Sequence, residues 1–188
     1  MILVNETREV LSINISEVAD KLKMDSTNYH FRKPSKNDGA EAWELVKQIG
    51  NLDLNSSYSY LMWCEIFSDT SIVVKDKESQ KVVGFISGFI HPDKTDTLFI
   101  WQVAVDESQR GNGLATKMLL QLLDREVCND VHYVEATVSP SNTPSKRLFF
   151  GLARKFNTNW KVSDYFTAND FPGTGHEDEL LFRIGPLK

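Results

Sequence analysis

The stretch "VDESQRGNGLATKML", residues 105–119, joins an apolar strand-like run to an amphipathic helical pattern through one arginine and two glycines. Glycine adopts positive φ angles and lets backbone amides approach an anion closely. The first turn of a helix adds unpaired N–H groups and the positive end of the helix dipole. Arg110 adds a guanidinium that can hold phosphate oxygens. The stretch therefore suits a diphosphate site, although an ordinary strand-to-helix turn explains it equally well.

Two other glycine-rich phosphate loops do not match this spacing. A dinucleotide fingerprint has a third glycine, whereas "GNGLAT" continues with alanine and threonine. A P-loop requires the pattern GxxxxGK[ST], which does not occur here. Both loop types are excluded, and the rest of the chain has to decide between the remaining interpretations.

The composition is typical of a globular domain. The chain has 188 residues, of which 41% are hydrophobic and 25% charged, enough for one domain with a substantial core. The net charge of −5 and the scattered basic residues argue against a nucleic-acid partner. The longest apolar run, "VVGFISGFI", is too short to span a bilayer, so we expect no membrane association.

The first residues and the cysteines bear on location. Residues 1–27 lack a signal-peptide pattern and show no strong periodicity, so we expect a flexible N-terminal extension before a domain at 28–188. Cys64 and Cys128 lie far apart without metal-type spacing, which favours free buried thiols in a reducing compartment. We therefore expect a cytoplasmic protein.

Hydrophobic periodicity predicts the order β-α-α-β-β-β-α-β-α-β-β. In the first helix Asp38 is the expected N-cap and Gly50 the expected stop. The three central strands are joined by short turns and should be antiparallel, whereas the strands on either side of the glycine-rich helix should be parallel. This is an α/β (α+β) fold with a mixed, mostly antiparallel sheet flanked by helices. The expected strands are 29–34, 70–76, 81–91, 97–106, 131–139, 159–166 and 178–185, and the expected helices are 38–50, 57–69, 114–127 and 142–156.

The pattern V-x-V-x4-R-G-x-G-L-A resembles the acetyl-CoA motif of the Gcn5-related N-acetyltransferases, and the element order matches their sheet. The resemblance implies that the loop amides bind the pyrophosphate of acetyl-CoA. It also implies that "WQVAV" diverges from "VEATV" to admit the pantetheine arm. Many members have a tyrosine that protonates the departing thiolate, and here that position is Phe149, so the acid is unassigned. The implied cofactor-binding residues are Val103, Val105, Arg110, Gly111, Asn112, Gly113, Leu114, Ala115, Asn142 and Ser145.

Four separated stretches closely resemble the diaminobutyrate acetyltransferases of ectoine synthesis, an osmoprotective pathway: "LDLNSSYSY", "TLFIWQVAVDESQRGNGLA", "EATVSPSNTPSKRLF" and "GHEDELLFRI". The resemblance implies acetylation of the side-chain (N4) amine of L-2,4-diaminobutyrate by a homodimer, with acetyl-CoA as cosubstrate and no metal. The implied substrate-binding residues are Asp53, Tyr58, Trp101, His176 and Glu179. Glu135 is the candidate catalytic base, acting directly or through a water, although a strand glutamate that faces solvent explains it nearly as well. Tyr58 is a second catalytic candidate.

The expected mechanism is direct attack of a neutral amine on the thioester within a ternary complex. Backbone amides around Val103 would stabilise the developing oxyanion, and neither cysteine is placed to form an acyl-enzyme. Three alternatives remain at this stage. The chain could acetylate another small amine or a protein N-terminus, act as a non-catalytic acyl-CoA sensor, or be a structural domain without a ligand.

Overall fold

The computed structural model describes residues 28–50 and 52–187, so the predicted N-terminal extension lies outside the described residues. Within them, one mixed sheet has the strand order β1-β2-β3-β4-β5-β7-β6. The strands are β1 (Tyr29–Arg32), β2 (Ile72–Asp76), β3 (Val82–His91), β4 (Lys94–Val105), β5 (Tyr133–Val138), β6 (Trp160–Phe166) and β7 (Glu179–Ile184). The α-helices are α2 (Gly39–Ile49), α3 (Ser57–Glu65), α4 (Leu114–Leu123) and α5 (Thr143–Lys155).

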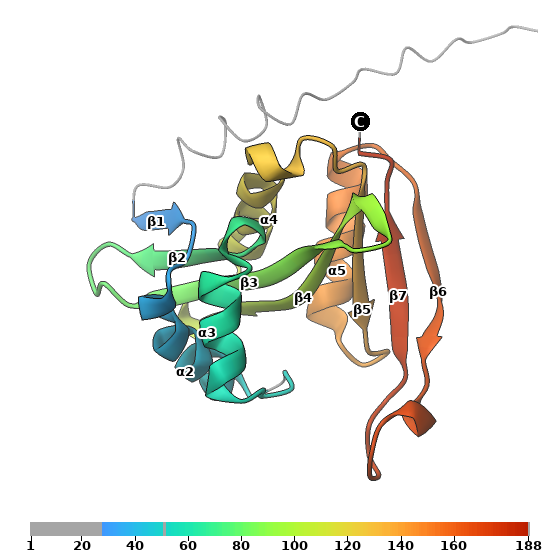
Figure 1. The fold of residues 1–188 in the computed structure, drawn as a ribbon, viewed down its shortest axis with the longest axis horizontal. Helices are drawn as coiled ribbons and strands as arrows, with labels where there is room; N and C mark the ends of the chain where they lie inside the picture. The colour runs from blue at the N-terminus through green and yellow to red at the C-terminus, as the bar shows by residue number, and fades with distance from the viewer. Residues whose placement is uncertain (1–27, 51, 188) are drawn as a thin grey trace, which may run out of the picture.

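The predicted order of elements and the fold class are confirmed. Strands β2, β3 and β4 pair antiparallel, and β4 and β5 pair parallel. Helices α2 and α3 cover one face of the sheet, and α4 and α5 cover the other (Figure 1). Alternate residues of β3 meet the two cores, with Phe85 under α2 and α3 and Ile86 under α4 and α5. Helix α2 packs against β3 and β4, and α4 packs against β2, β3 and β4 from the other face, whereas α5 packs against β7.

Two predicted helices end earlier than the periodicity suggests. α4 ends at Leu123 instead of residue 127, because Arg125 turns away and donates hydrogen bonds to the carbonyls of Asp69 and Ser71, at 2.9 and 2.6 Å. α3 ends at Glu65 instead of residue 69, and a 3-10 turn follows it. Apolar periodicity continues through both segments, so the ends are decided by tertiary contacts.

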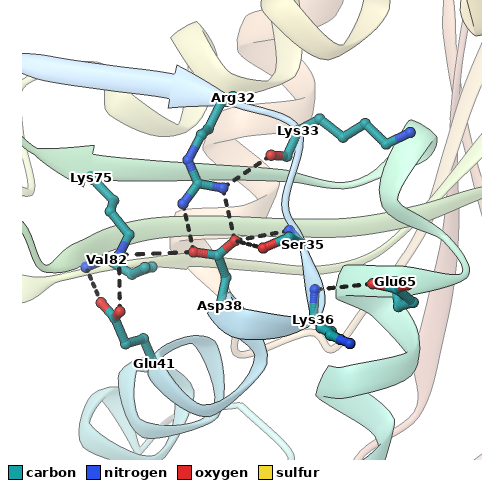
Figure 2. Close-up of polar contacts among 9 residues, drawn as sticks. All are labelled: Arg32, Lys33, Ser35, Lys36, Asp38, Glu41, Glu65, Lys75 and Val82. Atoms are coloured by element: carbon teal, nitrogen blue, oxygen red, sulfur yellow. Dashed lines mark hydrogen bonds and ion pairs between the residues drawn. The ribbon is translucent and has the colours of Figure 1, made fainter.

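Asp38 has a different role from the predicted one. It occupies the N-cap position of α2, but its side chain makes no capping hydrogen bond to that helix. Instead the buried carboxylate accepts hydrogen bonds from both terminal nitrogens of Arg32, at 2.6 and 2.8 Å, and from the backbone N–H of Ser35 (Figure 2). Beside it, Glu41 pairs with Lys75 of β2 at 2.9 Å. These contacts tie α2 to the β1–β2 edge of the sheet.

The hydrogen bonds to Asp38 also determine its ionisation. Burial alone would raise the pKa of this carboxyl, but the hydrogen bonds from Arg32 and Ser35 outweigh burial and lower it. A carboxyl with a lowered folded-state pKa stabilises the fold above its unfolded pKa. That contribution is lost as the pH falls through the folded-state value.

We predict that Asp38→Asn lowers the free energy of unfolding at pH 7 by about 3 kcal/mol, because Arg32 loses its buried partner. Asp69→Asn is the matched control, since its ion pair with Lys33 is exposed on both sides and should contribute about 0.5 kcal/mol or less. Urea unfolding should show the Asp38→Asn difference in full above about pH 4 and a shrinking difference below it. Equal effects of the two substitutions would contradict this role.

Candidate active site

Strands β4 and β5 separate after a short stretch of pairing, and a cavity opens between them. Their parallel ladder joins only residues 97–99 to residues 133–135, although both strands continue beyond it. The cavity has a volume of about 550 Å³ and is lined on its two sides by residues 100–103 and 136–139. Figure 1 shows β5, β7 and β6 running steeply across the direction of β2, β3 and β4. The predicted divergence of the two strands is confirmed.

A β-bulge in β4 places an aromatic side chain on the cavity wall. Ser87 of β3 pairs with Gln102, and Gly88 pairs with Ile100, so Trp101 is an extra residue on β4. The Trp101 side chain is 49% exposed and lines the cavity. An indole face at such a wall can bind a cationic group.

The bulge also changes which core the alternate residues of β4 meet. Before it, Ile100 belongs to the core under α4 and α5, and after it Ala104 belongs to the core under α2 and α3. Strict alternation would put both residues on one face. Gln102 follows the new phase, so its Nε2 donates to the carbonyl oxygen of Asp53 at 2.7 Å, and the hydroxyl of Tyr60 donates to its Oε1 at 3.1 Å.

One end of the cavity is acidic. Asp53, Glu177 and Glu179 line it together with His176, whose ring stacks on Phe171 at 3.5 Å between centroids. The Nε2 atom of His176 lies 3.4 Å from Oδ2 of Asp53. The pKa of His176 is raised, first by its hydrogen bond to the Glu177 carbonyl and then by the Asp53 carboxylate and the charge of Glu179. This end suits ligands with ammonium groups.

The segment carrying these acids is attached to the turn after β5. Glu179 accepts a hydrogen bond from the hydroxyl of Ser139 at 2.7 Å. Glu177 accepts one from the backbone N–H of Ser141 at 3.0 Å and another from its hydroxyl. Glu177 was not among the residues predicted from the sequence. Its spacing of two from Glu179 in an extended segment was the available signal, because such residues share a face.

The glycine-rich loop has the backbone that an anion site requires. Gly111 and Gly113 have φ angles of +84° and +69°, and an added Cβ at either would meet no atom within 4 Å, so conformation and not space requires glycine there. Gly113 is the N-cap of α4, which leaves the N–H groups of the first turn without helical partners. The exposed Arg110 pairs with Glu107 at 2.8 Å. The loop therefore fits a phosphate-bearing ligand.

A second helix begins at the same edge of the sheet. Because β4 and β5 are parallel, the helices that follow them, α4 and α5, start on the same side. Asn142 caps α5 by accepting a hydrogen bond from the N–H of Ser145 at 3.1 Å, and both residues line the cavity. Val103 lines it as well. The other predicted cofactor-binding residues lie outside its lining, at the end of β4, along the loop to α4 and in the first turn of α4: Val105, Arg110, Gly111, Asn112, Gly113, Leu114 and Ala115.

The two predicted catalytic residues are not brought to the cavity. Tyr58 lies in the first turn of α3 with 66% of its surface exposed, and it is not part of the lining. Glu135 is buried, and its carboxylate binds Arg183 of β7 and Lys94 of β4, the latter at 3.1 Å. Of the predicted substrate-binding residues, the structure brings together Asp53, Trp101, His176 and Glu179.

The cysteines and Phe149 are core residues. Cys64 and Cys128 are both buried and neither is in a disulfide, and burial raises the pKa of the Cys64 thiol to about 12. Neither cysteine lines the cavity. Phe149 is buried against Phe182 while one part of it reaches the cavity. A phenyl ring has no proton to donate, and neither thiol is placed to act as a nucleophile.

Within residues 28–50 and 52–187, the structure offers neither a metal-binding cluster nor a membrane-spanning helix. No cluster of three or more histidine, cysteine or acidic side chains there could hold a metal ion. None of the helices in those ranges has both the length and the apolar character needed to cross a membrane.

Comparison with known proteins shows which family the chain is similar to. Residues 40–152 match the family model described as the acetyltransferase (GNAT) family. An L-2,4-diaminobutyric acid acetyltransferase from Oceanobacillus iheyensis is 64% identical over 173 residues, which cover 91% of this chain and 96% of that protein. One from Halalkalibacterium halodurans is 52% identical over 161 residues, which cover 86% and 84% of the two chains.

A solved structure of an enzyme of the same kind is also similar to this chain. The diaminobutyrate acetyltransferase EctA from Paenibacillus lautus, in complex with L-2,4-diaminobutyric acid and coenzyme A, superposes with a TM-score of 0.83. It is 44% identical and covers 86% of this chain and 97% of its own. The NatC complex bound to a Gag peptide and CoA superposes with a TM-score of 0.69 at 14% identity, covering 85% of this chain and 99% of that one, and it shares the fold.

We predict that the pKa of His176, followed by NMR of its ring nitrogens, lies above the usual value of about 6.5. Asp53→Asn should lower it, because a neighbouring carboxylate favours the protonated ring. A His176 titration that does not respond to Asp53→Asn would show that the two side chains do not interact in solution.

Proposed function

The chain belongs to the acetyltransferase (GNAT) family, among the L-2,4-diaminobutyric acid acetyltransferases, and from this premise we propose that it transfers acetyl from acetyl-CoA to the side-chain N4 amine of L-2,4-diaminobutyrate. The product would enter ectoine synthesis and so serve osmoprotection. The observation that carries the proposal is the cavity between β4 and β5. It is acidic at one end, and two helix N-termini begin at the edge where its walls diverge.

The acidic end would hold the amino groups of the substrate. Diaminobutyrate carries two ammonium groups and one carboxylate near neutral pH. Asp53, Glu177 and Glu179 supply carboxylates for the ammonium groups, and Trp101 supplies an aromatic face. His176 has a raised pKa and in its protonated form suits the substrate carboxylate. The arrangement supports a small diamino acid over a peptide, because the cavity encloses a limited volume.

The other end would hold acetyl-CoA as the acetyl donor. The open N-terminus of α4, the left-handed glycines and Arg110 suit its pyrophosphate. Asn142 and Ser145 at the start of α5 suit its pantetheine arm, which would lie in the gap between the two strands. Acetyl-CoA supplies the activated thioester, and the protein supplies position and hydrogen bonds.

In the proposed reaction the neutral N4 amine attacks the thioester carbonyl directly in a ternary complex. A C–N bond forms, the C–S bond then breaks, and coenzyme A leaves as a thiolate that takes up a proton from solvent. Backbone amides near Val103 would stabilise the negative charge that develops on the carbonyl oxygen. The amine must first lose a proton, and Glu179 is our candidate acceptor because it lines the cavity and one carboxylate oxygen already accepts from Ser139. The ion-paired Glu135 and the exposed Tyr58 remain candidates from the sequence, and their positions favour a structural role.

We also propose that the enzyme works in the cytoplasm as a homodimer. Two buried cysteines outside any disulfide, together with the use of acetyl-CoA, support the location. Exposed apolar side chains along and beside α3, namely Leu54, Tyr58, Leu61 and Ile66, support association with a second copy. Light scattering should then give twice the chain mass of 21.4 kDa, and a monomer would contradict the dimer.

The decisive experiment follows thiol release from acetyl-CoA with a panel of amines and reads the product masses. The panel contains L-2,4-diaminobutyrate, ornithine, lysine, spermidine and a peptide. We predict selective turnover of diaminobutyrate with the acetyl group on N4, and intersecting lines in double-reciprocal plots, because both substrates must be bound before transfer. Parallel lines would indicate an acyl-enzyme instead.

The same panel separates the rival functions. Preferred turnover of another amine or of the peptide would retain the chemistry and remove the diaminobutyrate assignment. Binding of acetyl-CoA without turnover of any amine would favour an acyl-CoA sensor. A protein that acetyl-CoA does not stabilise against heat would be a structural domain, because specific binding raises stability by mass action.

We predict that Arg110→Ala raises the KM for acetyl-CoA about tenfold, because one charge-assisted contact to the pyrophosphate is lost. The KM for the amine should change little, since Arg110 lies outside the lining of the cavity. Arg154→Ala is the matched control, an exposed arginine near the opposite end of α5. An unchanged KM for acetyl-CoA in Arg110→Ala would remove this residue from the binding site.

A further inference from the structure

Gln102 joins the strand that lines the cavity to the loop that carries an acidic side chain. It is 7% exposed. A backbone carbonyl can only accept hydrogen bonds, so the Asp53 carbonyl fixes the amide nitrogen of Gln102 toward it and the amide oxygen toward Tyr60. Burial raises the pKa of the Tyr60 phenol, which keeps it protonated as the donor. The amide therefore has one orientation, with both ends engaged inside the protein.

The loop between α2 and α3 depends on this bond for the position of Asp53. In the described part of the loop, Trp43 of α2 donates to the carbonyl of Asn55 at 3.2 Å, and Gln102 donates to the carbonyl of Asp53 at 2.7 Å. The Asp53 side chain itself is 85% exposed and makes only the 3.4 Å contact to His176. Its carboxylate is thus located by its backbone, whose carbonyl accepts a hydrogen bond from Gln102 at 2.7 Å and a longer one, at 3.5 Å, from Asn55 of the same loop.

Gln102 also lies directly before Val103, on the wall where the proposed thioester would sit. One side chain therefore sets the separation between the acidic end of the cavity and the acetyl-donor end. We propose that Gln102 is a positioning residue that fixes this separation and so makes the enzyme select diamino acids by the length of their side chain. The inference rests on the proposed function and adds to it the residue that determines specificity.

The test uses two variants that break the same bond in different ways. Gln102→Met keeps the unbranched shape and removes both polar ends. Gln102→Glu keeps an oxygen for Tyr60 and replaces the N–H donor that faces Asp53. Ser87→Ala is the matched control, because Ser87 opposes Gln102 in the strand register and its buried hydroxyl has no hydrogen-bond partner among the described residues.

Both Gln102 variants should raise the KM for diaminobutyrate about tenfold, the equivalent of one lost hydrogen bond, and leave the KM for acetyl-CoA within about twofold of the wild type. The ratio of kcat/KM for diaminobutyrate over ornithine should fall by about the same factor, since a loose loop no longer measures length. The pKa of His176 should fall as Asp53 moves away. Ser87→Ala should match the wild type in all of these measurements.

An unchanged ratio of kcat/KM for diaminobutyrate over ornithine in both variants would overturn the inference. An equal rise of the KM values for diaminobutyrate and acetyl-CoA, together with a lower unfolding temperature, would also overturn it, because it would show that Gln102 only stabilises the fold. A wild-type enzyme that acetylates neither diamino acid would refute the proposed function instead. The two failures are therefore distinguishable in one set of assays.

Discussion

The separation of β4 and β5 after three paired residues is the constraint on which the site depends. Strands that part expose backbone N–H and C=O groups, and such groups destabilise a protein when they are buried without partners. Here each strand keeps its other neighbour: β4 pairs with β3 up to Val105, and β5 pairs with β7 up to Val138. The unpaired backbone is thus confined to the gap, where a ligand with amide groups can complete it.

The β-bulge at Trp101 lets strand β4 both line the cavity and contact α3. Without it, alternation would place Gln102 and Ala104 on the same face as Ile100, under α4 and α5. The extra residue sends Gln102 toward α3 and leaves Trp101 on the cavity wall. Gly88, opposite Ile100, accommodates the irregularity, because a Cβ there would lie 2.7 Å from the carbonyl oxygen of Phe99. The one extra residue in β4 therefore places Trp101 on the cavity wall and lets Gln102 hold the loop between α2 and α3.

Local patterns predicted most of the fold, and tertiary contacts decided the rest. The glycine loop and the helix after it were recognisable because positive φ angles and helical periodicity are local properties. The bulge was not, since "FIWQVAV" reads as one uninterrupted strand. The end of α4 depends on carbonyls near residue 70, and the partner of Asp38 is Arg32 across a turn.

For the candidate site, too, the sequence indicated residues but not how they lie relative to one another. Asp53, His176 and Glu179 were found in separate stretches through the resemblance, and no periodicity could show that they meet at one end of a cavity. Glu135 looked like a base because it lies on the strand beside the expected thioester. Its neighbours across the sheet, Arg183 and Lys94, are distant in sequence and engage its carboxylate away from the cavity.

At the acidic end of the cavity, the backbone of Asp53 is held by Gln102, whereas its carboxylate is exposed. Three carboxylates near one another repel, and a cation among them relieves that repulsion. In the free protein His176 partly fills this role through its long contact to Asp53, and an exposed pair of this kind contributes little stability. Glu177 and Glu179, by contrast, are held by serines of the turn after β5. An ammonium group of a ligand could therefore replace His176 at the Asp53 carboxylate at small energetic cost, while the hydrogen bonds from Ser139 and Ser141 hold Glu179 and Glu177 in place.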